Sequence, residues 1–82
     1  MLTKDKILQI ISKELKLDAA KVNPEANFIK DLGISSMTLW EMVLVLEDAF
    51  GLEVSDDEMK KLRTIKAVVD YIEGKVGKDL PE

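Results

Sequence analysis

The sequence predicts an all-α fold, a small four-helix bundle with a long first loop and a short third helix. Apolar residues recur at helical spacing in four separate segments, and capping residues stand at the start of these segments. No segment alternates between apolar and polar residues for long enough to predict a strand. With 82 residues, the chain fits one domain, expected to cover residues 1–82.

The first helix is expected over residues 4–16, with Thr3 placed to cap it. Its apolar residues follow helical spacing: Ile7, Leu8, Ile11 and Leu15. Residues 17–35 then form a connection long enough to be either functional or internally packed. Three apolar side chains are expected to tie this connection to the core: Val22, Phe28 and Leu32.

The second helix is expected to begin at Ser35 or Ser36 and to end at Phe50, with Gly51 as its stop. It carries two apolar stripes. The stripe expected to join the core is Leu39, Met42 or Val43, Leu46 and Phe50; the other is Met37, Trp40 and Leu44. A small domain can hardly bury both, so the second stripe is a candidate binding surface. The alternative is that Trp40 folds over the edge of the core as packing.

Two shorter helices complete the predicted bundle. Ser55 and Glu58 form a capping box at the start of the third helix, in which each side chain satisfies a backbone amide of the other residue. Met59 and Leu62 are expected to face inward. Thr64 is placed to cap the fourth helix, and the tail after Gly77 is expected to fray. The apolar residues of this helix are Ile65, Val68, Val69, Ile72 and Val76.

Composition argues against several functions. Histidine and cysteine are both absent, so the chain can form no Ser-His-Asp triad, thiolate metal site or redox pair. So small a domain also has little volume for an enclosed substrate pocket. We therefore expect no enzymatic activity. The absence of cysteine, of a secretory signal and of a membrane-spanning run predicts a cytoplasmic protein.

Charge is strongly segregated along the chain. Net charge is −4, but residues 31–59 contain eight acidic residues and no basic one. Such a field repels nucleic acid and attracts basic protein surfaces. The alternative is a solvated face that only keeps the protein in solution. A calcium-binding loop starting at Asp48 is excluded, because Phe50 and Leu52 fall where oxygen ligands are needed.

Ser36 has two interpretations. The simpler one is that Ser35 or Ser36 caps the helix, as serine often does at this position. The other is that the hydroxyl carries a phosphate ester, because a helix N-terminus favours a negative group. Gly33, just before it, allows a tight turn with positive φ. The residues alone leave both interpretations open.

A longer pattern resembles the acyl carrier protein signature. It comprises residues 28–37 (FIKDLGISSM), Glu41, residues 46–50 (LEDAF), residues 54–58 (VSDDE), residues 64–65 (TI) and residues 69–72 (VDYI). These landmarks occur in the family's order and spacing over residues 4–76. The resemblance implies a non-enzymatic carrier in which Ser36 both caps the helix and bears a covalent 4′-phosphopantetheine arm. A phosphopantetheinyl transferase would take that arm from coenzyme A.

The resemblance also implies partners and a place for the cargo. The second helix would dock onto basic patches of acyl-transferring or condensing enzymes. The residues that match this docking face are Met37, Trp40, Glu41, Leu44, Glu47, Asp48 and Asp56. The residues that would line a shelter for the acyl chain are Leu46, Phe50, Leu62, Val68 and Ile72. No nucleic acid, membrane or metal is expected, and the chain is expected to be a monomer.

Three positions depart from the family pattern, and several interpretations remain open. Ser35 and Thr38 replace acidic residues that usually flank the modified serine, and Met37 replaces leucine. The family tolerates the change at Met37. The lower charge around Ser36 and the bulky Trp40 one turn along the helix suggest a dedicated set of partners, selected more by shape and apolar contact than by charge. The cargo is expected to belong to fatty-acid, specialised lipid or polyketide synthesis. The alternatives are an aminoacyl, peptidyl or D-alanyl carrier, and an interaction module without an arm.

Overall fold

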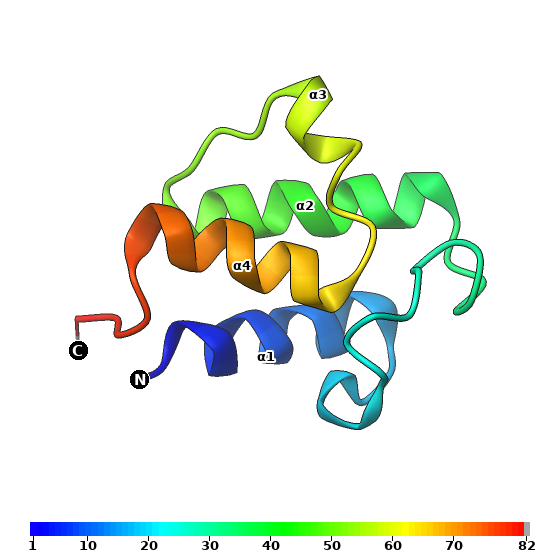
Figure 1. Ribbon diagram of the computed structural model, residues 1–82, viewed down its shortest axis with the longest axis horizontal. Helices are drawn as coiled ribbons and strands as arrows, with labels where there is room; N and C mark the ends of the chain where they lie inside the picture. The colour runs from blue at the N-terminus through cyan, green and yellow to red at the C-terminus, as the bar shows by residue number, and fades with distance from the viewer. Residues whose placement is uncertain (82) are drawn as a thin grey trace.

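The computed structural model describes residues 1–81 and is built from helices (Figure 1). Its elements are α1 (Thr3–Leu15), a 3-10 turn η1 (Ala19–Lys21), α2 (Ser36–Phe50), α3 (Asp56–Met59) and α4 (Ile65–Val76). Within these residues the only β-type pairings are two isolated bridges, Leu2 with Asp79 and Asn27 with Thr64. The predicted four-helix, all-α architecture is confirmed.

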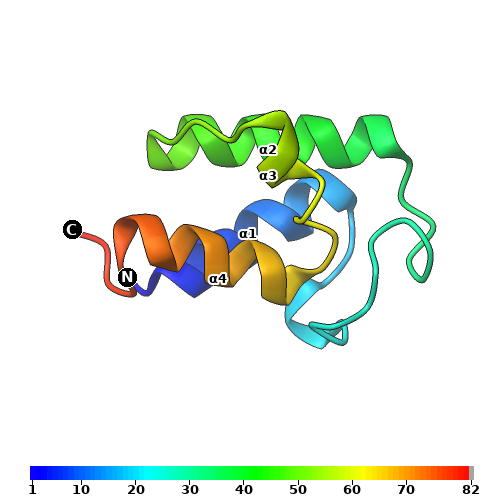
Figure 2. The same cartoon turned by 45° about the horizontal axis from the view of Figure 1, so that its top comes forward.

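The helices enclose one apolar core. α1 packs against both α2 and α4. Figures 1 and 2 show α3 beside α2, on the side away from α1. The largest apolar side chains with under 2% exposure are Phe28, Ile7, Ile11, Met42, Val43 and Val68. The core therefore draws on α1, α2 and α4, on Ala19 and Phe28 of the first connection and on Leu62 ahead of α4, whereas α3 itself buries none of its residues.

Thr3 does not cap α1, contrary to the sequence prediction. Leu2 occupies the capping position without a side-chain bond, and Thr3 is the first helical residue. The Thr3 side chain is fully buried, and its hydroxyl donates to the Gly77 carbonyl at 2.6 Å. A bond to a residue 74 positions away leaves no hydroxyl for the local cap.

The tail after Gly77 is not frayed over residues 78–80. The Thr3 amide donates to the Lys78 carbonyl at 2.9 Å, and the Leu80 amide donates to the Met1 carbonyl at 3.0 Å. Backbone groups that find such partners have no need to stay in water. The expected fraying is therefore wrong here; Glu82, the last residue of the expected domain, lies outside the described residues.

The long connection ends in a tightly bonded turn that leads into α2. The Asn27 side chain accepts hydrogen bonds from the amides of Ile29 and Lys30, both at 2.9 Å. The Phe28 amide donates to the Arg63 carbonyl at 2.8 Å, which fastens the turn to the segment before α4. Phe28 is fully buried. The other expected anchors, Val22 and Leu32, lie half-buried against the core.

The predicted caps of α3 and α4 are confirmed. Ser55 accepts from the Glu58 amide at 3.1 Å, and the Glu58 carboxylate accepts from the Ser55 amide at 3.2 Å. Thr64 accepts from the Ala67 amide at 3.0 Å. Leu62 is buried and is the main apolar contact of this region with the core, whereas Met59 is only half-buried.

Candidate functional site

Ser35, and not Ser36, caps α2. Ser35 has extended backbone angles, and its side-chain oxygen accepts from the Thr38 amide at 3.1 Å. The Ser35 hydroxyl in turn donates to the Thr38 hydroxyl at 2.9 Å. A cap must lie just outside the helix to reach an amide three residues on, and Ser36 is already helical. The expectation that Ser36 serves as both cap and attachment point is wrong in its first half.

The Ser36 hydroxyl is consequently available for chemistry. Ser36 is exposed, and its side chain makes no hydrogen bond within residues 1–81. It stands in the first turn of a 15-residue helix that has no acidic residue in that turn. The helix dipole and the first-turn amides therefore favour a negative group here, with no carboxylate competing. These residues fit the phosphodiester that joins a 4′-phosphopantetheine arm to a serine.

The second apolar stripe of α2 is exposed. Met37, Trp40 and Leu44 retain 69%, 50% and 40% of their accessible surface. On the other side of the helix, the buried residues are Leu39, Met42, Val43 and Leu46. The sequence prediction of one core stripe and one exposed stripe is confirmed, and Trp40 is not core packing. Val45, 38% exposed, is a further apolar residue that the two-stripe pattern missed.

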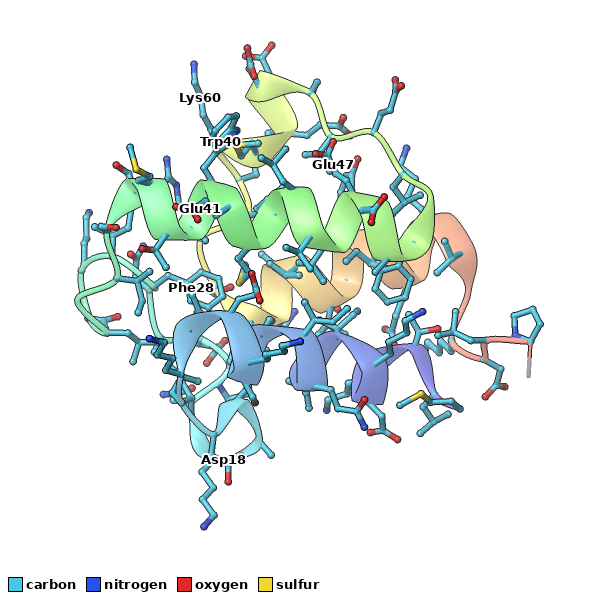
Figure 3. All side chains as sticks on the ribbon, turned by 180° about the vertical axis from the view of Figure 1, so that it is seen from behind. Asp18, Phe28, Trp40, Glu41, Glu47 and Lys60 are labelled. Carbon is cyan, nitrogen blue, oxygen red and sulfur yellow. The ribbon has the colours of Figure 1, made fainter. Side chains whose placement is uncertain are left out.

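The predicted acidic residues surround this stripe, but they are not equivalent. Glu41, Asp48 and Asp56 are exposed. Glu47 is half-buried, and its carboxylate accepts a hydrogen bond from the Val54 amide at 2.7 Å. Figure 3 shows Trp40 and Glu47 on the side of α2 that faces away from α1. Glu47 therefore has a structural task that the sequence did not indicate.

An open hollow adjoins this acidic end of α2. It has a volume of about 450 Å³ and is lined by Leu44, Glu47, Asp48, Gly51, Leu52 and Glu53. Its lining combines two leucines with three carboxylates. Such a lining suits the aliphatic stem and cationic head of a lysine or arginine from another protein.

The five residues expected to shelter a cargo chain all lie in or against the core. Leu46, Leu62, Val68 and Ile72 are buried. Phe50 is half-buried, and the Lys6 ammonium lies 5.1 Å from the centroid of its ring. The five share one apolar cluster, and their role as an acyl lining remains a prediction.

Tyr71 is a half-buried residue whose surroundings were not predicted from the sequence. Its hydroxyl oxygen is buried and has no hydrogen-bond partner among residues 1–81. Burial, and then the nearby Glu58 carboxylate, raise the pKa of Tyr71. The pKa of Glu58 is lowered, chiefly by the hydrogen bond from the Ser55 amide. The apolar spacing of the residues around Tyr71 does not indicate that its hydroxyl lies near the Glu58 carboxylate.

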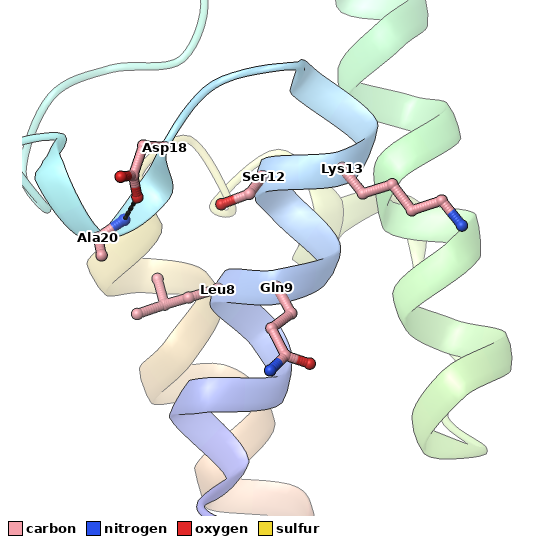
Figure 4. Close-up of a pocket in the computed structure, with 6 residues that line it drawn as sticks. All are labelled: Leu8, Gln9, Ser12, Lys13, Asp18 and Ala20. Atoms are coloured by element: carbon pink, nitrogen blue, oxygen red, sulfur yellow. Dashed lines mark hydrogen bonds between the residues drawn. The ribbon is translucent and has the colours of Figure 1, made fainter.

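A separate hollow of about 510 Å³ lies between α1 and η1 (Figure 4). Its polar side chains serve the local backbone: Ser12 accepts from the Ala19 amide at 2.9 Å, and Asp18 accepts from the Ala20 amide at 3.2 Å. None of the docking residues or Ser36 lines it. This hollow is therefore not part of the candidate site.

Two features that residues 1–81 lack bear on other functions. Residues 1–81 contain no cluster of three or more acidic side chains arranged to hold a metal ion. Over the same residues, no helix has the length and apolar character that crossing a bilayer requires.

Comparison with known proteins identifies the family. A family model described as "Phosphopantetheine attachment site" matches residues 5–72. An acyl carrier protein of Solidesulfovibrio magneticus is 38% identical over 73 residues, covering 89% of this chain and 94% of the relative. Acyl carrier proteins from two strains of Nitratidesulfovibrio vulgaris are 37% identical over 75 residues, covering 92% of this chain and 99% of each relative.

These matches cover nearly the whole described structure. They imply a covalently bound 4′-phosphopantetheine, and they argue against the alternative of an interaction module without an arm. When attached, the arm supplies a terminal thiol that holds an acyl group as a thioester. The chain therefore belongs to the acyl carrier proteins, which carry intermediates between enzymes and are not catalysts themselves.

Proposed function

We propose that Ser36 bears the phosphopantetheine arm, and that the chain delivers acyl intermediates to enzymes of fatty-acid, specialised lipid or polyketide synthesis. One observation carries the assignment: Ser35 performs the capping, so the exposed Ser36 hydroxyl is left without a partner in residues 1–81. Modification of Ser36 would therefore cost the helix no capping bond. A phosphopantetheinyl transferase is the partner that would perform it.

Partner enzymes would dock on α2 beside the arm. The exposed Met37, Trp40 and Leu44 offer the apolar contact that interface centres use, and tryptophan is enriched among residues that dominate binding energy. Glu41, Asp48 and Asp56 would steer basic patches toward this surface. Glu47 contributes charge as well, while its bond to Val54 holds the following connection in place.

The cargo chain would enter the core from the side covered by α3. α3 has four residues and buries none of them, so displacing it exposes little apolar surface. Leu46, Leu62, Val68 and Ile72 belong to one buried apolar cluster, and Phe50 packs against it. A wholly apolar lining favours a hydrocarbon chain over an aminoacyl group. The aminoacyl, peptidyl and D-alanyl alternatives have no such support.

The cargo can be tested with carriers of defined load. A broad-specificity transferase supplied with acyl-coenzyme A, from butyryl to dodecanoyl, installs the loaded arm in one step; an alanyl arm is the polar comparison. We expect the melting temperature to rise with chain length, because each buried methylene contributes up to about 0.8 kcal/mol. A melting temperature independent of chain length, or highest for the alanyl arm, would contradict a sheltered hydrocarbon cargo.

Four further expectations belong to the proposal. Residues 1–82 form one carrier domain, the chain acts as a monomer, and its compartment is the cytoplasm, which the lack of cysteine favours. Nucleic acid is not among its partners, because the acidic segment around α2 would repel the phosphate backbone.

A further inference from the structure

A group of basic residues borders the acidic docking face. Its members, here called the basic sector, are Lys30, Lys60, Lys61 and Arg63. They are the basic residues that directly flank the acidic segment 31–59 in sequence, and the fold brings the two flanks together. The Phe28 amide donates to the Arg63 carbonyl, and Lys30 and Arg63 line a common hollow of about 320 Å³ with Asn27 and Ile29.

The cations of the basic sector form no ion pair among residues 1–81. Lys30, Lys60 and Lys61 are exposed, and Arg63 is half-exposed. Within residues 1–81, no member of the sector lies within 4 Å of a carboxylate, unlike Lys21 and Lys66, which pair with Asp18 and Asp70. Arg63 donates only to the Lys60 carbonyl, at 3.2 Å. Their charges are therefore available to another molecule.

The position of Lys60 and Lys61 ties the sector to docking. They directly follow α3, and the next residue, Leu62, is buried and fixes this end of α3 to the core. Figure 3 shows Lys60 and Trp40 both pointing away from α1, on the side of the molecule that α3 occupies. A protein that covers Trp40 must therefore accommodate the positive charge of Lys60 on this side, and the exposed Lys61 is the next residue in the chain.

We infer that the docking face is bipolar: its partners pair a basic patch, opposite Glu41, Asp48 and Asp56, with an acidic group opposite Lys60 and Lys61. This inference rests on the proposed docking at α2. A partner with a uniformly basic surface is attracted by the acids but repelled by the two lysines. The lysines thus select among enzymes that would all recognise an acidic helix, which is specificity by an unfavourable charge contact.

The first test measures loading by a broad-specificity phosphopantetheinyl transferase with a basic carrier-binding surface. Lys60→Glu/Lys61→Glu makes the face uniformly acidic and should raise kcat/KM for arm transfer several-fold, with the gain shrinking as salt rises. The control is Lys4→Glu/Lys78→Glu, which changes the net charge equally at the end of the bundle that carries both termini (Figure 1). The control should gain much less. Equal gains, or no gain, would overturn the inference.

The second test looks for the acidic group directly. Single Lys→Glu and Arg→Glu variants of the transferase's carrier-binding surface are assayed against the parent chain and Lys60→Glu/Lys61→Glu. We expect at least one transferase variant to load the parent chain faster than the unaltered transferase does. The same transferase variant should load Lys60→Glu/Lys61→Glu more slowly than the unaltered transferase does. If every variant is slower on both carriers, no acidic group is favoured opposite the lysines and the inference fails.

Failure of the inference is distinguishable from failure of the proposed function. Complete loading of the parent chain at Ser36 in a long incubation supports the carrier assignment, whatever the rates of the charge variants. If the basic sector instead binds the arm's own phosphate, Lys60→Glu/Lys61→Glu should slow loading and lower the melting temperature of the loaded protein alone. That outcome also overturns the inference.

Discussion

The Glu47 carboxylate accepts a hydrogen bond from the Val54 backbone amide at 2.7 Å, and this contact joins α2 to the connection that leads into α3. The docking helix and the short helix beside it are therefore positioned together. A residue that family resemblance marks only as a docking acid is also an anchor of the fold.

Replacing Glu47 should separate these two roles. Glu47→Ala leaves a partly buried amide without its acceptor and should lower the free energy of unfolding by about 1–2 kcal/mol. Glu47→Gln keeps an acceptor oxygen and should lose less stability, while it loses the charge that attracts partners. Urea unfolding measures the first effect, and the salt dependence of arm transfer measures the second. Equal stability of Glu47→Ala and the parent chain would show that the contact contributes nothing.

The two neighbouring serines should respond differently to substitution. Ser35→Ala removes the cap of α2 and should cost about 1 kcal/mol of stability, yet it should still accept the arm. Ser36→Ala removes no bond seen in residues 1–81 and should leave the melting temperature nearly unchanged. Thermal unfolding of the two variants side by side gives the comparison. A larger loss of stability in Ser36→Ala than in Ser35→Ala would contradict the role of Ser35 as the cap of α2.

Trp40 should matter for partners and little for folding. Trp40→Ala truncates a side chain that is half exposed, so stability should change by less than about 1 kcal/mol, while kcat/KM for transfer by partner enzymes falls. Leu39→Ala, one residue earlier and buried, is the matched control and should cost about 2–5 kcal/mol. If Trp40→Ala destabilises as much as Leu39→Ala, Trp40 belongs to the core.

Acid should loosen α3 through Glu58. The hydrogen bond from the Ser55 amide lowers the pKa of Glu58 below its ordinary value of 4.5, so the folded state favours the ionised form. This stabilisation is complete above the ordinary pKa and is lost as pH falls through the lowered one. Amide hydrogen exchange around α3, corrected for its intrinsic pH dependence, should show weaker protection at low pH, and Glu58→Gln should lessen that change. If Glu58→Gln loses as much protection at low pH as the parent chain does, a group other than Glu58 causes the effect.

Local patterns in the sequence were enough for the helices and for the exposed stripe. Helical spacing separates Leu39 and Leu46, which are buried, from Trp40 and Leu44, which are not. A period of 3.6 residues carries that information within one segment. The capping box of α3 is equally local, because both of its members lie within four residues.

Contacts between distant segments could not be predicted in this way. Nothing near Thr3 in the sequence indicates that its hydroxyl bonds to Gly77, and that bond both removes the expected cap and orders the tail. The choice between Ser35 and Ser36 depended on backbone angles at adjacent positions, which composition does not specify. The burial of the Tyr71 hydroxyl is likewise set by how α4 packs.

The central claim is that Ser36 carries the arm, and mass spectrometry tests it most directly. The parent chain, Ser36→Ala and Ser35→Ala are incubated with coenzyme A and a broad-specificity phosphopantetheinyl transferase, and intact masses are followed by fragmentation of the loaded chain. The account predicts one added phosphopantetheine on the parent chain and on Ser35→Ala, located on Ser36, and none on Ser36→Ala. An arm located on another residue, or a folded parent chain that no transferase loads, would contradict it.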